Sequence, residues 1–185
     1  MRRPHPTRLD RRGAAAIEFV IIAPVLLAMF AGVVDIGNLL ITRFRLNAAV
    51  ASGVNYSMVH SDDVGTDGAP ALSTSLARLV ANSSQTSGVT ATVTVNNGPS
   101  ATAVGSGEAT VSSNGSATTS NALCYCPTTG SDWAITTTCG NSCTGGGTAG
   151  RFVRITARKT FTPLLSTYGL VRNGTVVATN IVQTE

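Results

Sequence analysis

The sequence predicts an α+β protein in which a long N-terminal helix, transmembrane and then amphipathic, packs on a small, mostly antiparallel β-sheet domain. Three observations predict this fold class. An uncharged stretch runs from Phe19 to Val34, helical periodicity continues to about residue 60, and later segments alternate apolar with polar residues. The order of these patterns places the helix first and the sheet after it.

The charged residues are distributed unevenly, and this bears on the class of protein. The net charge is +4, but residues 1–13 hold five arginines against Asp10, which leaves eight basic and eight acidic residues after Gly13. A nucleic-acid-binding domain carries its basic residues on the folded part, so nucleic acid is not expected as a partner. Low aromatic (5%) and charged (12%) contents also argue against a large enzyme core.

The first element is a predicted membrane-spanning helix. The apolar character of Phe19–Val34 continues past Asp35 to Ile41, which is enough to cross roughly 30 Å at about 1.5 Å per residue. The arginines that precede the helix place the N-terminus in the cytoplasm and residues beyond about 45 in the periplasm. A secretory signal peptide is the competing interpretation, but Glu18 interrupts the start of the apolar region, the apolar run is longer than a usual signal core, and no clear small-x-small cleavage site with a polar break follows it.

The same helix is expected to continue outside the bilayer. Leu46, Val50 and Val54 recur at helical spacing, and no proline interrupts the segment before His60. We therefore predict one helix over residues 14–60, transmembrane to about residue 41, with an extracytoplasmic domain over residues 61–185. The amphipathic half of the helix needs that domain to pack on.

Five further segments follow in the domain. After the turn sequence SDDVGTDG, residues 69–84 place Leu72, Leu76, Leu79 and Val80 on one face of a second helix. Residues 88–98 alternate as a half-buried strand that ends at an Asn-Gly turn. Residues 100–121 are rich in Ser, Thr, Ala and Gly, and are either a weak strand or a loop. Residues 151–161 and 174–185 predict the remaining strands.

The segment RRGAAAIEFVIIAPVLL resembles the N-terminus of TadE-like proteins, pseudopilins of the tight-adherence (Flp) pilus system, over roughly residues 11–55. The resemblance rests on a basic leader and on Gly13, Glu18, Phe19, Pro24, Asp35 and Gly37. It implies a pilin-like fold and cleavage between Gly13 and Ala14 by a prepilin peptidase, with residues 1–13 removed. It also implies other pilin or pseudopilin subunits and an inner-membrane pilus assembly platform as partners.

Glu18 has a chemical role that follows from this cleavage. The new amine at Ala14 would lie four residues from Glu18, on the same helix face, and could pair with its carboxylate within one subunit or between two. The simpler alternative is that Glu18 reaches the cytoplasmic interface. Asp35 is expected near the outer headgroups, paired with Arg43, Arg45 or another subunit.

Two other residues shape the membrane helix. Pro24 lacks an amide hydrogen and should kink or loosen the helix. Gly37, with Ala28, Ala31 and Gly32, gives a narrow surface suited to close helix packing.

The four cysteines lie in a Gly/Ser/Thr-rich insertion at about residues 100–150. Cys124 and Cys126 are too close to bridge each other comfortably, so two disulfides to Cys139 and Cys143 are expected, with two connectivities open. Zinc bound by four thiolates is the alternative, but the spacing departs from that of zinc ribbons.

The leading hypothesis is a non-enzymatic minor pilin or pseudopilin that initiates, caps or decorates a Tad-type pilus for surface adherence. A single-pass anchored periplasmic binding module is the second hypothesis, and an envelope enzyme the third. No catalytic motif is found, and neither a metal nor a cofactor is expected.

Overall fold

The computed structural model describes residues 11–65, 67–105, 110–114, 123–126, 134–164 and 174–184. Residues 1–10, most of the predicted leader, lie outside these ranges. The helical elements are α1 (Arg11–Val59), the short 3-10 helix η1 (Ser61–Asp63) and α2 (Ala69–Ser83). The strands are β1 (Val89–Val95), β2 (Ser100–Gly105), β3 (Thr110–Asn114), β4 (Cys124–Cys126), β5 (Ala134–Thr137), β6 (Phe152–Thr160) and β7 (Thr175–Gln183).

Five strands form the main sheet, in the order β3-β2-β1-β6-β7. Every neighbouring pair is antiparallel, which confirms the predicted α+β class. The register aligns threonines across four strands, because Thr92 lies opposite both Thr102 and Thr156, and Thr156 lies opposite Thr179. Hydroxyl pairs at 3.3 Å (Thr92–Thr102) and 3.2 Å (Thr179–Thr156) link this row on the face away from the helices.

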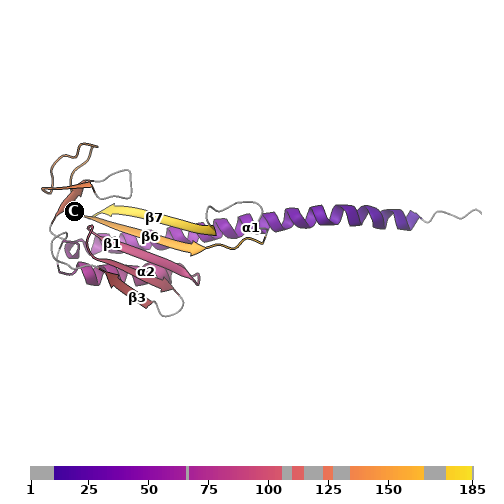
Figure 1. The fold of residues 1–185 in the computed structure, drawn as a ribbon, viewed down its shortest axis with the longest axis horizontal. Helices are drawn as coiled ribbons and strands as arrows, with labels where there is room; N and C mark the ends of the chain where they lie inside the picture. The colour runs from indigo at the N-terminus through magenta and orange to yellow at the C-terminus, as the bar shows by residue number, and fades with distance from the viewer. Residues whose placement is uncertain are drawn as a thin grey trace, which may run out of the picture.

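The two helices cover the other face of the sheet (Figure 1). The second half of α1 packs on β6 and β7, while α2 packs on β1 and β2, and the helices also contact each other. Because side chains alternate along a strand, the valine and isoleucine side chains on one face of the sheet point toward the helices, as predicted. The core is built from Leu46, Val50, Leu72, Leu76, Val80, Val89, Val93, Val95, Val153 and Ile155.

The turn between β1 and β2 differs from the expected Asn-Gly turn by one residue. The two residues with positive φ are Asn96 (45°) and Asn97 (54°), and Gly98 donates its N–H to the Val95 carbonyl at 2.9 Å. Asparagine tolerates this left-handed conformation because its short polar side chain bonds locally. The turn therefore needs no glycine at its centre.

Residues 100–105 and 110–114 are strands of the main sheet, β2 and β3. Their composition allows either strand or loop, and their predicted place was the start of the insertion. The disulfide-linked part of the chain lies later, in β4, β5 and residues 138–150, where β4 and β5 form a separate two-stranded sheet. In Figure 1 this part lies beside the end of β7, at the opposite end of the domain from the free half of α1.

Candidate functional site

The first half of α1 extends away from the domain (Figure 1). Among the helices that the structure describes, α1 is the one long and apolar enough to cross a membrane, over Ala15–Val59, and no residue of its most apolar stretch is buried. Large apolar side chains there are well exposed, for example Phe19 (69%), Leu27 (70%) and Phe30 (69%). A free apolar helix of this kind suggests membrane anchoring.

Two carboxylates delimit this free half. Glu18 is exposed near its beginning, whereas Asp35 is only 2% exposed. They lie seventeen positions apart in the sequence, which corresponds to about 26 Å of helix, close to the roughly 30 Å of a bilayer's hydrocarbon core. Between them, every side chain of α1 is exposed or half-buried, and Asp35 is the first that the domain buries.

The structure shows a partner for Asp35 within the domain. Its Oδ1 accepts a hydrogen bond from the Leu164 backbone N–H at 2.8 Å, while Arg43 and Arg45 are exposed. Residues 161–164, which follow β6, reach α1 at this level, and Phe161 donates its N–H to the Gly174 carbonyl at 2.8 Å. One oxygen of the Asp35 carboxylate is therefore bonded to a backbone amide of the domain.

The other residues predicted to act in processing and assembly lie on the free half or at its junction with the domain. Gly13 and Glu18 are exposed, and Ala14 is helical, although its side chain is outside the described set. The helix continues through Pro24 as one element from Arg11 to Val59. A Cβ on Gly37 would meet no heavy atom within 4 Å, so this position leaves room for another helix to approach.

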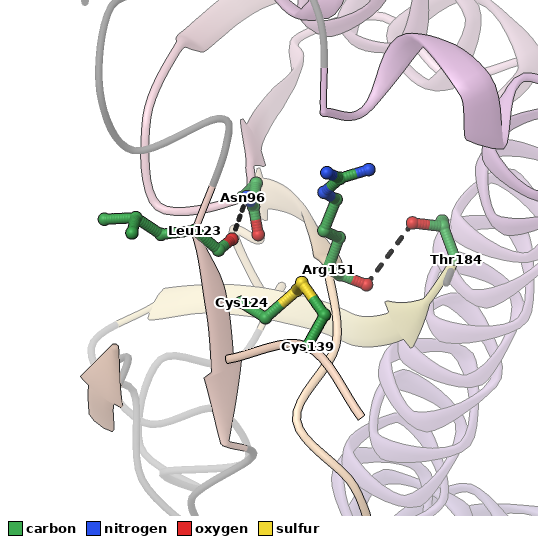
Figure 2. Close-up of a disulfide and its surroundings, with 6 residues drawn as sticks. All are labelled: Asn96, Leu123, Cys124, Cys139, Arg151 and Thr184. Carbon is green, nitrogen blue, oxygen red and sulfur yellow. Dashed lines mark hydrogen bonds between the residues drawn. A yellow bond between two sulfur atoms is a disulfide. The ribbon is translucent and has the colours of Figure 1, made fainter. Parts of the chain in front are cut away.

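The cysteines form two disulfides, Cys124–Cys139 and Cys126–Cys143, with Cα–Cα distances of 5.1 and 5.7 Å. This is one of the two connectivities that the spacing left open. Tyr125 and Gly150 exchange backbone hydrogen bonds of 2.8 and 3.0 Å, which attach β4 to the residue just before Arg151 and β6. Figure 2 shows the Cys124–Cys139 bond beside Arg151 and Asn96.

Asn96 connects the disulfide-linked part with the main sheet, and the sequence analysis did not single it out. It is fully buried, its Nδ2 donates to the Leu123 carbonyl at 2.8 Å, and its backbone N–H donates to the Phe152 carbonyl at 2.8 Å (Figure 2). The only sequence signal for Asn96 was its place in a predicted turn. The sequence also did not indicate the contact made by Leu164 or the close packing at Gly53.

The exposed apolar half of α1 is a surface suited to helix packing and membrane anchoring. Within the described ranges, no group of three or more His, Cys, Asp and Glu side chains could hold a metal ion. His60 stacks on Tyr56 with ring centroids 4.0 Å apart, and its Nδ1 lies 3.0 Å from the Tyr56 carbonyl oxygen, so both contacts are with the last turn of α1.

Comparison with known proteins matches residues 13–55 to the family described as TadE-like protein. The matched range covers nearly all of α1 and includes each predicted processing and assembly residue. No curated protein and no solved structure matches the chain.

Proposed function

We propose that this chain, a TadE-like protein by the match of residues 13–55, is a membrane-anchored minor pilin or pseudopilin that acts in the assembly of a Tad-type pilus. In this role it would initiate, cap or decorate the fibre, and so contribute to surface adherence. Its partners would be other pilin-like subunits, a prepilin peptidase and the inner-membrane assembly platform. TadE-like proteins are structural rather than enzymatic, and the proposal assigns no catalysis to this chain.

One observation carries the proposal. The TadE-like segment coincides with a helix whose first half is bare and apolar, while its second half is part of the domain core through Leu46, Ala49 and Val50. The same rigid element can therefore anchor the subunit in a bilayer and later pack against other helices while the domain stays folded. An anchor joined to its domain by a flexible linker would not transmit such packing.

The proposed assembly step uses Glu18 and the amine created at Ala14. An unpaired carboxylate within the bilayer costs about 2–3 kcal/mol on insertion scales, so pairing with the amine of its own or a neighbouring subunit favours packing. Glu18 is exposed on α1, as this contact requires. The disulfide-linked part would project away from the membrane, because it lies at the end of the domain opposite to the free helix.

Mass measurement of the mature N-terminus tests the proposal. We expect the protein in the envelope fraction to begin at Ala14, and Gly13→Glu to block this processing because the peptidase would meet a large charged side chain at the bond. An N-terminus at Met1 would favour the anchored binding module instead. One beyond residue 35 would show that the helix is a signal peptide, and either result would contradict the proposal.

The place of the subunit can be tested separately. Sheared pili and washed membranes from the same cells should be compared for this chain by quantitative mass spectrometry. A decorating or capping subunit would be recovered with the pili, whereas an initiating subunit would remain mainly with the membrane. After gentle crosslinking, this chain should be found linked to pilus proteins in the pili or in the membranes. If it is found linked to them in neither sample, a role in assembly is contradicted.

A further inference from the structure

We propose that residues 161–164, directly after β6, form a lipid-contacting edge of the domain, with Leu164 at the outer boundary of the bilayer core and Asp35 holding it there. The inference rests on the membrane anchoring in the proposed function and adds a second site of lipid contact. The geometry points to it because one hydrogen bond fixes Leu164 at a known level of the membrane helix.

The level of the outer bilayer boundary follows from α1. Starting at Glu18, a bilayer core of roughly 30 Å requires about twenty residues of helix, which places its outer limit close to Asp35. The exposed side of α1 stays apolar beyond that point, since Ile36, Leu40 and Phe44 are 47%, 47% and 69% exposed. Exposed charges first appear at Arg43 and Arg45. Asp35 therefore lies at the boundary or slightly inside it.

Leu164 is fixed at the same level. Its N–H lies 2.8 Å from Asp35 Oδ1, so the two residues must share one depth, although 129 positions separate them in sequence. The Leu164 side chain is 69% exposed, so its apolar surface is available for contact with lipid at this level. In water this exposure would be unfavourable, whereas at the headgroup boundary a leucine transfers favourably into lipid.

The same contact explains how Asp35 can lie near lipid. A carboxylate facing hydrocarbon is costly, but Asp35 is 2% exposed and accepts a backbone N–H. Leu164 contacts it through its backbone, and Phe161, 9% exposed and bonded to Gly174, ties residues 161–164 to the core. Asp35 thus positions Leu164, and this contact keeps the Asp35 carboxylate bonded at the bilayer boundary.

Tryptophan fluorescence in vesicles tests this placement in the full chain. Trp133, the single tryptophan of the sequence, would be replaced by phenylalanine in every variant, and one tryptophan introduced by Leu164→Trp. Two matched leucine positions serve as controls: Leu27→Trp in the free helix and Leu123→Trp at the far end of the domain, 70% and 39% exposed. The vesicles would be phosphatidylcholine brominated near the headgroups or near the bilayer centre.

We expect the Leu164→Trp emission to be quenched more by shallow than by deep bromines and to be blue-shifted relative to Leu123→Trp. Leu27→Trp should be quenched most by deep bromines, and Leu123→Trp by neither. Quenching of Leu27→Trp without quenching of Leu164→Trp would overturn the lipid-contacting edge and leave the anchor in place. Absence of quenching at both positions would overturn the anchor as well.

The role of Asp35 is tested by adding Asp35→Ala to the Leu164→Trp variant. Loss of the acceptor should release residues 161–164, so the preference for shallow over deep quenching should fall, while Leu27→Trp with Asp35→Ala should be quenched as before. An unchanged depth preference would show that Asp35 does not position these residues. Intact disulfides by mass spectrometry would verify that the domain remains folded in these variants.

Discussion

Glu18 is the residue on which the proposed assembly chemistry depends. It is exposed on the free half of α1, where another helix can reach its carboxylate. We expect Glu18→Ala to leave insertion and cleavage intact, since these depend on the apolar helix and the leader. Assembly should weaken, because the Ala14 amine loses its counter-charge when helices pack. Fractionation should show more protein in the membrane and less with pili.

Glu18→Gln separates charge from hydrogen bonding at this position. It keeps the shape and polarity of the side chain, so it should resemble Glu18→Ala if the ion pair is what matters. If both variants assemble at the wild-type level, Glu18 only reaches the cytoplasmic interface, and cleavage at Gly13 would remain as the main support for the proposed function.

Gly53 sets how closely α1 approaches the other layers of the domain. A Cβ at this position would lie 2.7 Å from Val80 Cγ2 on α2 and 3.0 Å from Ile155 Cδ1 on β6. Overpacking of this kind typically costs about 1–3 kcal/mol, against a gain of up to about 1 kcal/mol for replacing glycine by alanine in a helix. We therefore expect Gly53→Ala to lower the midpoint of thermal unfolding.

Gly37→Ala is the matched control, because a Cβ there meets nothing within 4 Å. It should leave the midpoint unchanged or raise it slightly through helix propensity. Equal midpoints for Gly53→Ala and Gly37→Ala would mean that α1 can shift away from α2 and β6 without loss of packing.

Among the elements, those with strong periodicity were predicted from the sequence. The helices α1 and α2 and the strands β1, β6 and β7 lie within a few residues of their expected bounds. Their apolar residues recur at the period of the structure they form, so each local pattern agrees with the tertiary packing. Leu72, Leu76 and Val80, for example, are all buried on α2.

The strands β2 and β3 were left undecided because their composition carries little local preference. Ala101 and Ala103 of β2 are buried, but alanine and glycine have low strand propensity and the flanking residues are small and polar. Pairing with β1, from Val89–Gly105 to Thr94–Ser100, decides the conformation. A side chain at Gly105 would also collide with the Ala81 carbonyl oxygen, at 2.5 Å, which explains a glycine beneath α2.

The disulfide-linked element allows a prediction of pairing. Removal of the Cys126–Cys143 bond by Cys126→Ser with Cys143→Ser should leave Cys124–Cys139 intact, with no reactive thiol. The mismatched control, Cys124→Ser with Cys143→Ser, breaks both bonds and should expose two thiols to maleimide. Each bond closes a loop of about 15 residues, worth about 3 kcal/mol in the chain-entropy model. The mismatched variant should therefore lose more stability than the matched one.

At the scale of the whole molecule, the sequence predicted which residues lie on the long N-terminal helix. It did not predict which of them the domain contacts. The positions of Glu18, Phe19 and Pro24 follow from one helix, so local pattern was sufficient. The contact of Asp35 with Leu164 joins residues 129 positions apart, and a backbone amide carries no sequence signature. The predicted pairing of Asp35 with Arg43, Arg45 or another subunit considered no contact within the domain, so it did not include Leu164.

The division of α1 between anchor and core predicts how far the chain can be shortened. A fragment of residues 34–185 keeps Asp35 and the whole buried part of α1, so it should fold and unfold cooperatively with both disulfides formed. A fragment of residues 52–185 loses Leu46, Ala49 and Val50, which are 1%, 1% and 3% exposed. Burial of a leucine or valine contributes about 1.5–3 kcal/mol, a large share of the roughly 5–15 kcal/mol that stabilises a domain.

The shorter fragment should therefore lack a cooperative transition, and its surface over β6 and β7 should bind a hydrophobic dye. Circular dichroism during heating and dye fluorescence measure these two effects. Leu46→Ala in the longer fragment is the graded control: it removes one core side chain without removing the helix, and should lower the midpoint by an intermediate amount at a cost of about 2–5 kcal/mol. If residues 52–185 unfold at the same temperature as residues 34–185, then α1 is an anchor lying against a domain that is already complete. The rigid link between membrane helix and domain, on which the assembly role depends, would then be lost.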